Sequence, residues 1–420
     1  MWFLLIFLVS LPSTSLAVDS RILPAPATAA ARQSSFVTAS GSLLIAPNGS
    51  ELRLRGISLG NWLLPEGYMF GFKKAVAARQ IREVTNELLG PDESARFWND
   101  FEESYITQDD IRLIARCGFN SIRIPFHYAY FQTDDSPPLM RERGFELLDR
   151  LIRWASIEHL YVILDLHAAP GGQTGENIDD GWGYPWLFES PVSQQRCIDL
   201  WRRIAEHYRD EPTVLGYELL NEPIPHFPEY QHLMPLLEPL YKKITTAVRD
   251  IDPHHLIVLG GAKWNSDFTV FGAPFASNLI YAFHKYWTEP DVSVIREYLT
   301  FRDRYQVPIW CGETGENSLK WITAFCQTLE QNRVSWCFWP YKKMVPETCI
   351  VTIRPPAGWD NVIRYADTFR GGTYEEKRKA RPSREAIRKT FQEFSRNIRF
   401  SRGKLNAGFI KALGMTVPTP

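Results

Sequence analysis

The sequence has no surplus of charge of either sign. Its 47 lysines and arginines are balanced by 48 aspartates and glutamates, so the formal net charge is -1 and the isoelectric point is near 6.8. Proteins that bind nucleic acids or acidic membrane surfaces usually carry a clustered basic excess, which is absent here. We therefore expect no nucleic-acid partner, and a substrate that is neutral or small.

Cysteine is scarce as well. The six cysteines are widely spaced and include no Cys-x-x-Cys pair, so the sequence contains no zinc-binding pattern. Cys311 and Cys337 lie within apolar segments, where a buried thiol is the ordinary interpretation. We expect no metal and no other cofactor, and the spacing determines no disulfide pairing.

Long apolar runs are confined to the start of the chain. Residues 2–11 are apolar, and Ser15-Leu16-Ala17 has the small-x-small form of a signal-peptide cleavage site. We therefore predict a signal peptide over residues 1–17, a disordered lead-in over 18–35, and a secreted or periplasmic location. A retained N-terminal anchor is the alternative, because no lysine or arginine precedes the apolar run. Later runs are too short to span a bilayer, so we expect no membrane contact beyond export.

Internal repeats are missing, and no Gly-x-Gly-x-x-Gly signature of a dinucleotide-binding sheet follows the first strand. The chain contains instead eight short apolar segments of strand type that alternate with amphipathic helical segments. The strand-type segments are residues 52–59, 119–126, 161–168, 214–220, 256–260, 279–286, 307–313 and 334–339. This alternation predicts an α/β fold with a parallel sheet. The count of eight favours a (β/α)8 TIM barrel over an open doubly wound sheet.

We expect the barrel domain to cover residues 36–398. A β-hairpin precedes the barrel, with residues 36–45 and 51–54 on either side of the turn Pro47-Asn48-Gly49. The loops that follow the strands are long, and the loop over 170–186 is rich in glycine and aromatic residues, which is typical of functional loops. Residues 399–420 are interpreted as a basic C-terminal tail.

Two carboxylates stand where two of the predicted strands end. Glu222 lies in Asn221-Glu222-Pro223 at the end of the fourth strand-type segment, and Glu313 ends the seventh. In a parallel barrel the carboxyl ends of all strands open onto one face, so acids that are distant in the sequence can meet there. A facing pair of carboxylates is what the cleavage of a glycosidic bond requires. A single acid at a strand end is more often a solvated residue or an ion-pair partner, so the hypothesis depends on the neighbouring residues.

Six further residues lie at or near strand ends in the same way. They are Arg123, His167, Asn221, His284, Tyr286 and Trp339. Each has an ordinary interpretation, the histidines and the tryptophan as core residues and the arginine as a structural ion-pair partner. Eight such residues at the end where barrel enzymes place their catalytic groups favour one shared substrate site.

The chemistry of glycoside cleavage divides the roles. One carboxylate must be ionised to attack the anomeric carbon, and the other must be protonated to donate to the leaving oxygen. Arg123 and Tyr286 are suited to hold Glu313 ionised, which leaves Glu222 as the acid. The remaining predicted contacts are Asn221 with the sugar 2-hydroxyl, His167 and His284 with Glu222 and the sugar, and Trp339 as the floor of the subsite.

These segments resemble glycoside hydrolase family 5, the retaining, cellulase-like (β/α)8 family. The matching pieces are Ser121-Ile-Arg-Ile-Pro125, Leu164-Asp-Leu-His-Ala168, Leu220-Asn-Glu-Pro223, His284-Lys-Tyr286, Gly312-Glu313 and Phe338-Trp339. They supply every habitual active-site residue type of that family. The resemblance implies a secreted retaining glycosidase that cleaves a β-linked glucan or related β-glycan, with Glu222 as acid/base and Glu313 as nucleophile.

Two segments resemble the exo-β-1,3-glucanase-like branch of the family, Gly60-Asn-Trp-Leu63 and Leu166-His-Ala-Ala-Pro-Gly171. The sequence departs from that branch in the loop over 172–180 and at Thr314, where an aromatic residue is common. The branch's substrate therefore does not carry over. Two alternatives stay open, a glycosidase of the same fold that acts on a glycolipid or furanoside, and a catalytically idle barrel that binds carbohydrate. The expected partner is an oligo- or polysaccharide, and we expect a monomer.

Overall fold

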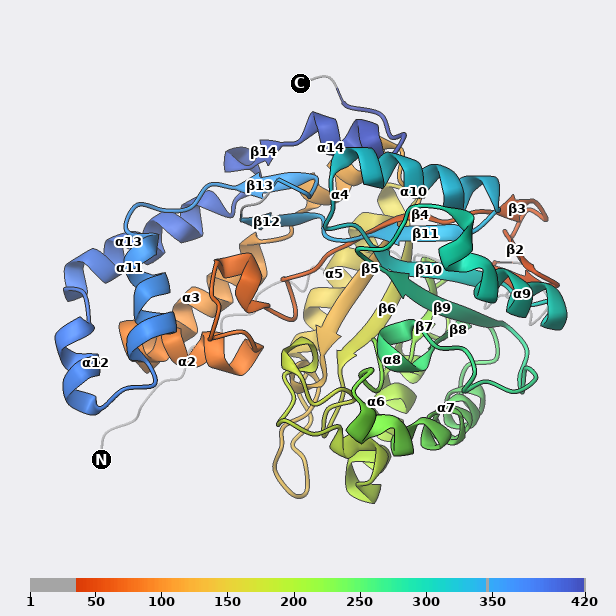
Figure 1. Ribbon diagram of the computed structural model, residues 1–420, viewed down its shortest axis with the longest axis horizontal. Coiled ribbons are helices and arrows are strands. Elements are labelled where there is room, and N and C mark those ends of the chain that lie inside the picture. The colour runs from red at the N-terminus through yellow and green to blue at the C-terminus, as the bar shows by residue number, and fades with distance from the viewer. Residues whose placement is uncertain (1–34, 345–346, 419–420) are drawn as a thin grey trace, which may run out of the picture.

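The computed structural model describes residues 35–344 and 347–418, and its centre is a closed barrel of eight parallel strands (Figure 1). Around the barrel the strands follow the order β10-β11-β4-β5-β6-β7-β8-β9. They are β4 (Arg55–Ser58), β5 (Ser121–His127), β6 (Tyr161–Ala168), β7 (Val214–Glu218), β8 (Leu256–Gly260), β9 (Leu279–Lys285), β10 (Ile309–Thr314) and β11 (Ser335–Phe338). The predicted (β/α)8 barrel is confirmed. The predicted signal peptide and all but the last residue of the lead-in lie outside the described residues.

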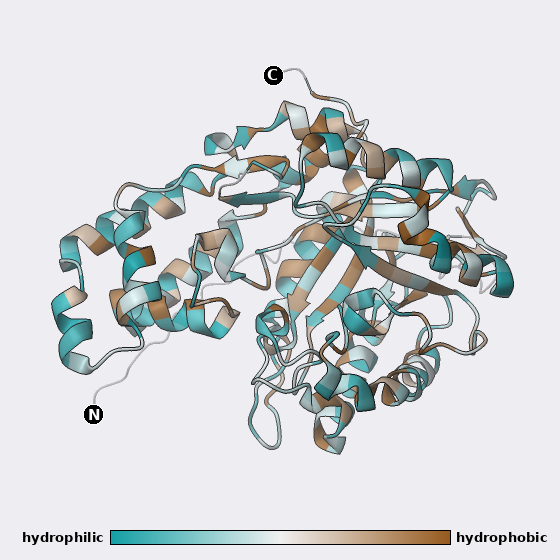
Figure 2. Ribbon diagram, viewed as in Figure 1, coloured by the Kyte–Doolittle hydropathy of each residue, from teal (hydrophilic) through white to brown (hydrophobic). Residues whose placement is uncertain are grey.

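The barrel strands are apolar because they are covered on both faces. All of them are buried along their length except for single residues at the ends of β4, β5, β6 and β9. A parallel sheet between a filled interior and a ring of helices offers no solvated face, so its strands appear as continuous apolar runs and not as an alternating pattern. In Figure 2 brown residues are frequent along the central strands, whereas the surrounding helices carry much teal. Each of the eight predicted segments overlaps one strand, and the third and fifth match β6 and β8 at both ends.

Helices cover the outside of the barrel. The α-helices are α2 (Ala78–Leu89), α3 (Pro91–Ser104), α4 (Gln108–Cys117), α5 (Arg143–Ile157), α6 (Pro191–Tyr208), α7 (Met234–Arg249), α9 (Arg296–Tyr305), α10 (Leu319–Gln331), α11 (Trp359–Arg364), α12 (Tyr374–Ala380), α13 (Arg384–Asn397) and α14 (Ala407–Ala412). The short element α8 (Ala262–Asn265) is a turn with a left-handed backbone. Short 3-10 turns lie at Gly67–Phe70, Tyr128–Tyr130, Asn177–Asp179, Trp186–Phe188, Pro228–Leu233, Val292–Ile295 and Phe400–Arg402. A capping box opens α4, where Asp110 accepts hydrogen bonds from the backbone and side chain of Thr107.

The predicted N-terminal hairpin closes the amino end of the barrel. It consists of β1 (Thr38–Ser40), β2 (Leu43–Ile45) and β3 (Glu51–Leu52) in one antiparallel sheet. Val37 and Leu44 pack with interior residues of the barrel strands such as Ile163 and Val258 in one buried cluster. The amino end is therefore sealed by apolar side chains, and the opposite end is left for a polar site.

One helix that the sequence prediction missed is α3. Gly90-Pro91 marks the end of α2, as its glycine and proline predict, but Pro91 also occupies the first turn of α3, where its missing N–H costs nothing. Residues 340–379, for which the sequence predicts only a loop after the eighth strand, contain β12 (Lys342–Met344), β13 (Val351–Ile353), α11 and α12. None of these residues lines the main cavity at the strand ends.

The helices α2, α3, α11, α12 and α13 form an arm beside the barrel, on the left of Figure 1. Its interior is aromatic: Trp359 stacks on Phe394 with ring centroids 4.9 Å apart, and Phe97 meets Phe391 edge-on at 5.1 Å. Residues 399–418, which we interpreted as tail, are folded. Here β14 (Lys404–Leu405) pairs with β13, and α14 buries Phe409.

Candidate active site

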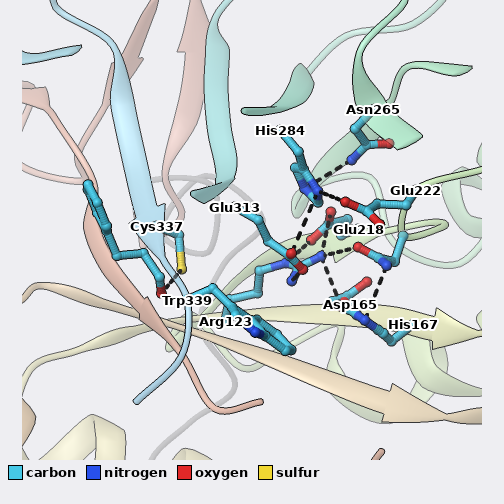
Figure 3. A network of polar contacts seen from close by, with 12 residues as sticks. Arg123, Asp165, His167, Glu218, Glu222, Asn265, His284, Glu313, Cys337 and Trp339 are labelled. Atoms are coloured by element: carbon cyan, nitrogen blue, oxygen red, sulfur yellow. Dashed lines mark hydrogen bonds and ion pairs between the residues drawn. The ribbon is translucent and has the colours of Figure 1, made fainter. Parts of the chain in front are cut away.

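The eight predicted site residues come together at the carboxyl end of the barrel strands, and six of them are labelled in Figure 3. Six of them line one cavity of about 760 Å³: His167, Glu222, His284, Tyr286, Glu313 and Trp339. The other two, Arg123 and Asn221, are fully buried directly behind it and bond to residues of its wall.

No described helix is both long enough and apolar enough to cross a membrane.

Arg123 is the buried centre of the site. Its guanidinium donates to both oxygens of Glu218 at 2.6 and 3.0 Å, to Asn221 Oδ1 at 2.8 Å and to Glu313 Oε1. Asp165 Oδ2 lies 3.0 Å from the same group. A fully buried charge is tolerated only when its donors are satisfied, and here three carboxylates and an amide satisfy them. The predicted ion-pair role of Arg123 is therefore confirmed, with three acidic partners, Asp165, Glu218 and Glu313.

Glu313 accepts hydrogen bonds at both carboxyl oxygens. One comes from Arg123, and the other from the Tyr286 hydroxyl at 3.0 Å. The strand is irregular here, because the register of β10 against β9 shifts between Cys311 and Glu313. Gly312 permits a close approach, since a Cβ at this position would lie 2.9 Å from His284 Nε2. The carboxylate is thus fixed in one orientation at the wall of the cavity.

Glu222 has a different environment. Its backbone φ of 45° is left-handed, a conformation that is rare for glutamate and turns the chain sharply before Pro223. The carboxyl Oε1 lies 2.7 Å from His284 Nδ1, and 14% of the side chain is exposed to the cavity. Burial raises the pKa of Glu222 to about 7, against smaller lowering effects of His167 and Arg123. Near neutral pH this carboxyl is therefore available in its protonated form.

The two carboxyl groups are close together. An oxygen of Glu222, an oxygen of Glu313 and a ring nitrogen of His284 all lie within 4.8 Å of one another. Among the described residues this is also the one group of three acidic, histidine or cysteine side chains that is close enough to hold a metal ion. Protein hydrogen bonds already engage each of the three side chains.

His167 and Asn221 form a second hydrogen-bonded chain. His167 Nδ1 lies 2.6 Å from Asp165 Oδ2, and its Nε2 lies 3.2 Å from Asn221 Nδ2. Burial lowers the pKa of His167 to about 4, so the ring is neutral, and its one N–H points at Asp165. Asn221 gives its oxygen to Arg123 and one N–H to His167, and so fixes the position of both side chains behind the cavity.

Trp339 forms one wall of the cavity. Its ring is stacked on His167, with centroids 5.7 Å apart and an interplanar angle of 11°, and its Nε1 donates to the Tyr68 hydroxyl at 2.7 Å. The indole can lie here because residue 60 is a glycine: a Cβ at Gly60 would lie only 2.6 Å from the Trp339 ring. The segment that begins at Gly60 in the sequence is therefore in contact with the predicted floor residue.

The sequence prediction missed several residues of the cavity. Glu66 lines it, is almost fully buried, and has a pKa raised well above its ordinary value by burial and by the nearby Glu313 and Glu222. Tyr68 connects the Trp339 indole to Glu316, which forms an ion pair at 2.6 Å with the buried Lys343. The signal for Glu66 was its position three residues after Gly60-Asn-Trp-Leu63. Nothing in the sequence pointed to Lys343.

The glycine-rich loop over 170–186 contributes both wall and support. Glu176, Asn177 and Ile178 line the cavity. Gln173, which is fully buried, donates from its amide to His167 O at 2.7 Å and to Asn221 O at 3.0 Å. The loop therefore ties the ends of β6 and β7 together, which confirms that it belongs to the site.

Comparison with known proteins gives consistent matches. The family model for cellulase (glycosyl hydrolase family 5) matches residues 83–344. A β-xylosidase of Phanerodontia chrysosporium is 30% identical over 344 residues, which are 73% of this chain and 71% of that protein. Endoglucanase C of Acetivibrio thermocellus is 26% identical over 59% of this chain and 87% of its own length. A probable glucan 1,3-β-glucosidase A of Aspergillus clavatus is 31% identical over 50% of this chain and 52% of its own length.

Proposed function

Because the chain belongs to the cellulase family, glycosyl hydrolase family 5, it is a glycoside hydrolase, and we propose that it cleaves a β-linked glucan or related β-glycan by double displacement. Glu313 is the nucleophile of this proposal and Glu222 the acid/base. The relatives bear names of enzymes for β-linked glucans and xylosides, which supports a β-glycan as the substrate class.

The observation that carries the proposal is the spacing of the two acids. Carboxyl oxygens of Glu222 and Glu313 lie within 4.8 Å of each other. Retaining glycosidases hold their two carboxyl groups about 5–5.5 Å apart, whereas inverting enzymes leave about 6.5–9.5 Å so that a water fits between acid and sugar. The short spacing of these oxygens supports direct attack by a carboxylate.

The environments of the two acids support their separate roles. Glu313 accepts from Arg123 and Tyr286, an arrangement that suits a carboxylate ready to attack the anomeric carbon. Glu222, with a pKa near 7, gives its proton to the leaving oxygen as the bond between anomeric carbon and oxygen breaks. The deprotonated Glu222 then takes a proton from water, which attacks the glycosyl-enzyme and releases Glu313.

The proposal assigns sugar contacts to other residues of the site. Asn221, directly behind the wall, bonds the 2-hydroxyl through its second amide N–H in this proposal, a contact that strengthens in the transition state. Trp339 offers an apolar surface for the ring. Glu66, whose pKa is raised well above its ordinary value by burial, lines the same cavity and is assigned to hydroxyl groups of the sugar.

The proposal is tested by sugar release from β-1,3-, β-1,4- and mixed-linkage glucans, mannan, xylan and aryl β-glycosides. We expect wild type to cleave at least one member and Glu313→Ala to lose at least about 10³-fold in kcat/KM on it. Glu229→Ala, which removes an exposed acid from the turn Pro228–Leu233, is the matched control and should retain activity. Full activity of Glu313→Ala would overturn the assignment. A wild type inactive on the whole panel would favour a glycolipid or furanoside substrate, or a barrel that only binds carbohydrate.

We also propose that the protein is exported after cleavage at Ala17. The support is the apolar run over residues 2–11 and the small-x-small segment that follows it. N-terminal sequencing of the protein recovered from culture medium should begin at Val18. A protein that stays cell-bound and begins at Met1 would favour the retained anchor.

A further inference from the structure

Asn265 lies on the far side of His284 from Glu222. Its side chain is fully buried, and its Nδ2 lies 3.1 Å from His284 Nε2. The other ring nitrogen, Nδ1, lies 2.7 Å from Glu222 Oε1. Figure 3 shows the three side chains in sequence, with His284 between the amide and the carboxyl group. A continuous hydrogen-bonded chain therefore runs from the loop after β8 to the proposed acid/base.

The loop that holds Asn265 has an unusual backbone. Lys263, Trp264 and Asn265 are all left-handed, with φ of 52°, 58° and 57°. Each such residue costs free energy unless the surroundings impose the conformation, and a run of three is expected only where the local geometry matters. The Trp264 amide donates to Ile224 O at 3.2 Å, which ties this turn to the loop that bears Glu222.

Gly260 completes the position of the amide. A Cβ at Gly260 would lie 2.2 Å from Asn265 Oδ1, so a side chain there would displace it. The strand end, the left-handed turn and the bond to Ile224 therefore hold the Asn265 side chain against His284. Packing alone does not require an asparagine here, because a small apolar side chain would fill the same space without burying a polar group.

The contact with Asn265 determines which nitrogen of His284 carries the proton. Burial lowers the pKa of His284 to about 4, so the ring is neutral and has one N–H. The Asn265 amide donates to Nε2, and the proton is therefore on Nδ1, which donates to Glu222 Oε1. An oxygen that accepts this bond does not carry the acid proton, so the proton of Glu222 is held on Oε2.

We propose that Asn265 is a positioning residue for the acid/base step, because it fixes the His284 tautomer that keeps the proton of Glu222 on Oε2. This inference rests on the proposed function of Glu222. In the step concerned, Glu313 bonds to the anomeric carbon, the electron pair of the breaking bond goes to the leaving oxygen, and that oxygen takes the proton from Oε2. If the ring proton were on Nε2, the unprotonated Nδ1 would accept a hydrogen bond from the Glu222 carboxyl group. The acid proton would then be directed at His284 and not at the leaving oxygen.

The variant Asn265→Asp tests this directly. Aspartate accepts left-handed backbone nearly as well as asparagine does, but its carboxylate cannot donate to Nε2 and draws the ring proton there. On aryl glycosides with a poor leaving group, such as 4-methoxyphenol, we expect kcat/KM to fall about 10- to 100-fold, a partial loss of general acid catalysis. On the 2,4-dinitrophenyl glycoside, which needs no acid, kcat/KM should stay within about twofold, with kcat and KM falling together.

A second variant and two controls make the outcome decisive. Asn265→Gly removes the amide and keeps the left-handed turn, so it should give the same dependence on the leaving group. Asn278→Asp is the matched control, because Asn278 is also left-handed and donates to His254 O at the opposite end of the barrel. It should leave the ratio between the two substrates unchanged.

An equal loss on both substrates in folded Asn265→Asp, or no loss on either, would overturn the role of Asn265. The second control, Glu222→Ala, must itself show the dependence on the leaving group. If it does not, the proposed function of Glu222 fails, whatever the Asn265 variants do.

Discussion

At the carboxyl end of the barrel strands, Arg123 packs with three acids behind the cavity, whereas the amino end is filled by the apolar side chains of the hairpin. Both ends also contain left-handed residues other than glycine. At the amino end Gln306 only ends a helix, α9, where a glycine is the usual residue. At the carboxyl end Glu222 and Asn265 are themselves parts of the site. The same backbone feature thus ends a helix at Gln306 and positions site residues at Glu222 and Asn265.

The largest expected effect comes from removing the centre of the polar end. Arg123→Met leaves Asp165, Glu218 and Glu313 buried without their cation. We expect it to lower the free energy of unfolding by about 3–5 kcal/mol and kcat/KM by at least about 10²-fold. Urea unfolding and steady-state kinetics measure the two losses. A variant that lost activity with unchanged stability would contradict the expectation that Arg123 stabilises the fold.

A change at the amino end should affect stability alone. Leu44→Ala opens a space in the cluster that seals the barrel, and we expect a loss of about 2–4 kcal/mol in the free energy of unfolding. Because the hairpin is at the opposite end from the cavity, kcat/KM should remain within about twofold of wild type at a temperature where the variant is folded. A large fall in kcat/KM would show that the two ends are coupled.

Glu222→Gln should stabilise the fold at alkaline pH. The folded-state pKa of Glu222 is raised to about 7 from an ordinary 4.5, so the folded state binds the proton more tightly than the unfolded state does. The contribution to stability is therefore present below about pH 4.5 and is lost as pH rises through 7. At pH 8 we expect Glu222→Gln to be about 1–3 kcal/mol more stable than wild type. No difference between pH 5 and pH 8 would contradict the raised pKa.

The smallest expected effect is at a helix end. Gln306→Gly replaces a left-handed residue whose side-chain amide donates to Asp303 O, and we expect a gain of about 0.5–1 kcal/mol with unchanged kinetics. Thermal unfolding measures the gain. A destabilised Gln306→Gly would mean that the side chain contributes more than the backbone conformation costs.

The sequence predicted the barrel because each strand is buried on both faces and therefore apolar throughout. It predicted the eight site residues because barrel strands deliver their end residues to one face, so Glu222 and Glu313 could be paired across about ninety positions of sequence. It failed where the signal was ambiguous. Gly90-Pro91 correctly marks the end of α2, but Pro91 also begins α3, which this pattern does not reveal.

Residues that act through others were also beyond the reach of sequence. Asn265 has no motif, and its role is visible only once the left-handed turn places it beside His284. Lys343 occurs in a segment interpreted as a loop, and its pairing with Glu316 depends on how β12 returns to the barrel. Such contacts arise from tertiary structure and leave no local pattern of hydropathy or spacing.

The central claim, that Glu313 attacks the sugar while Glu222 supplies and removes the proton, is tested most directly by trapping the covalent intermediate. The protein is incubated with the 2,4-dinitrophenyl 2-deoxy-2-fluoro-β-glycoside of whichever sugar the substrate panel identifies, then digested and analysed by mass spectrometry. We predict a glycosyl adduct on the peptide that contains Glu313, and none in Glu313→Ala. An adduct on another residue, or hydrolysis with inversion of the anomeric centre and no adduct, would contradict the account.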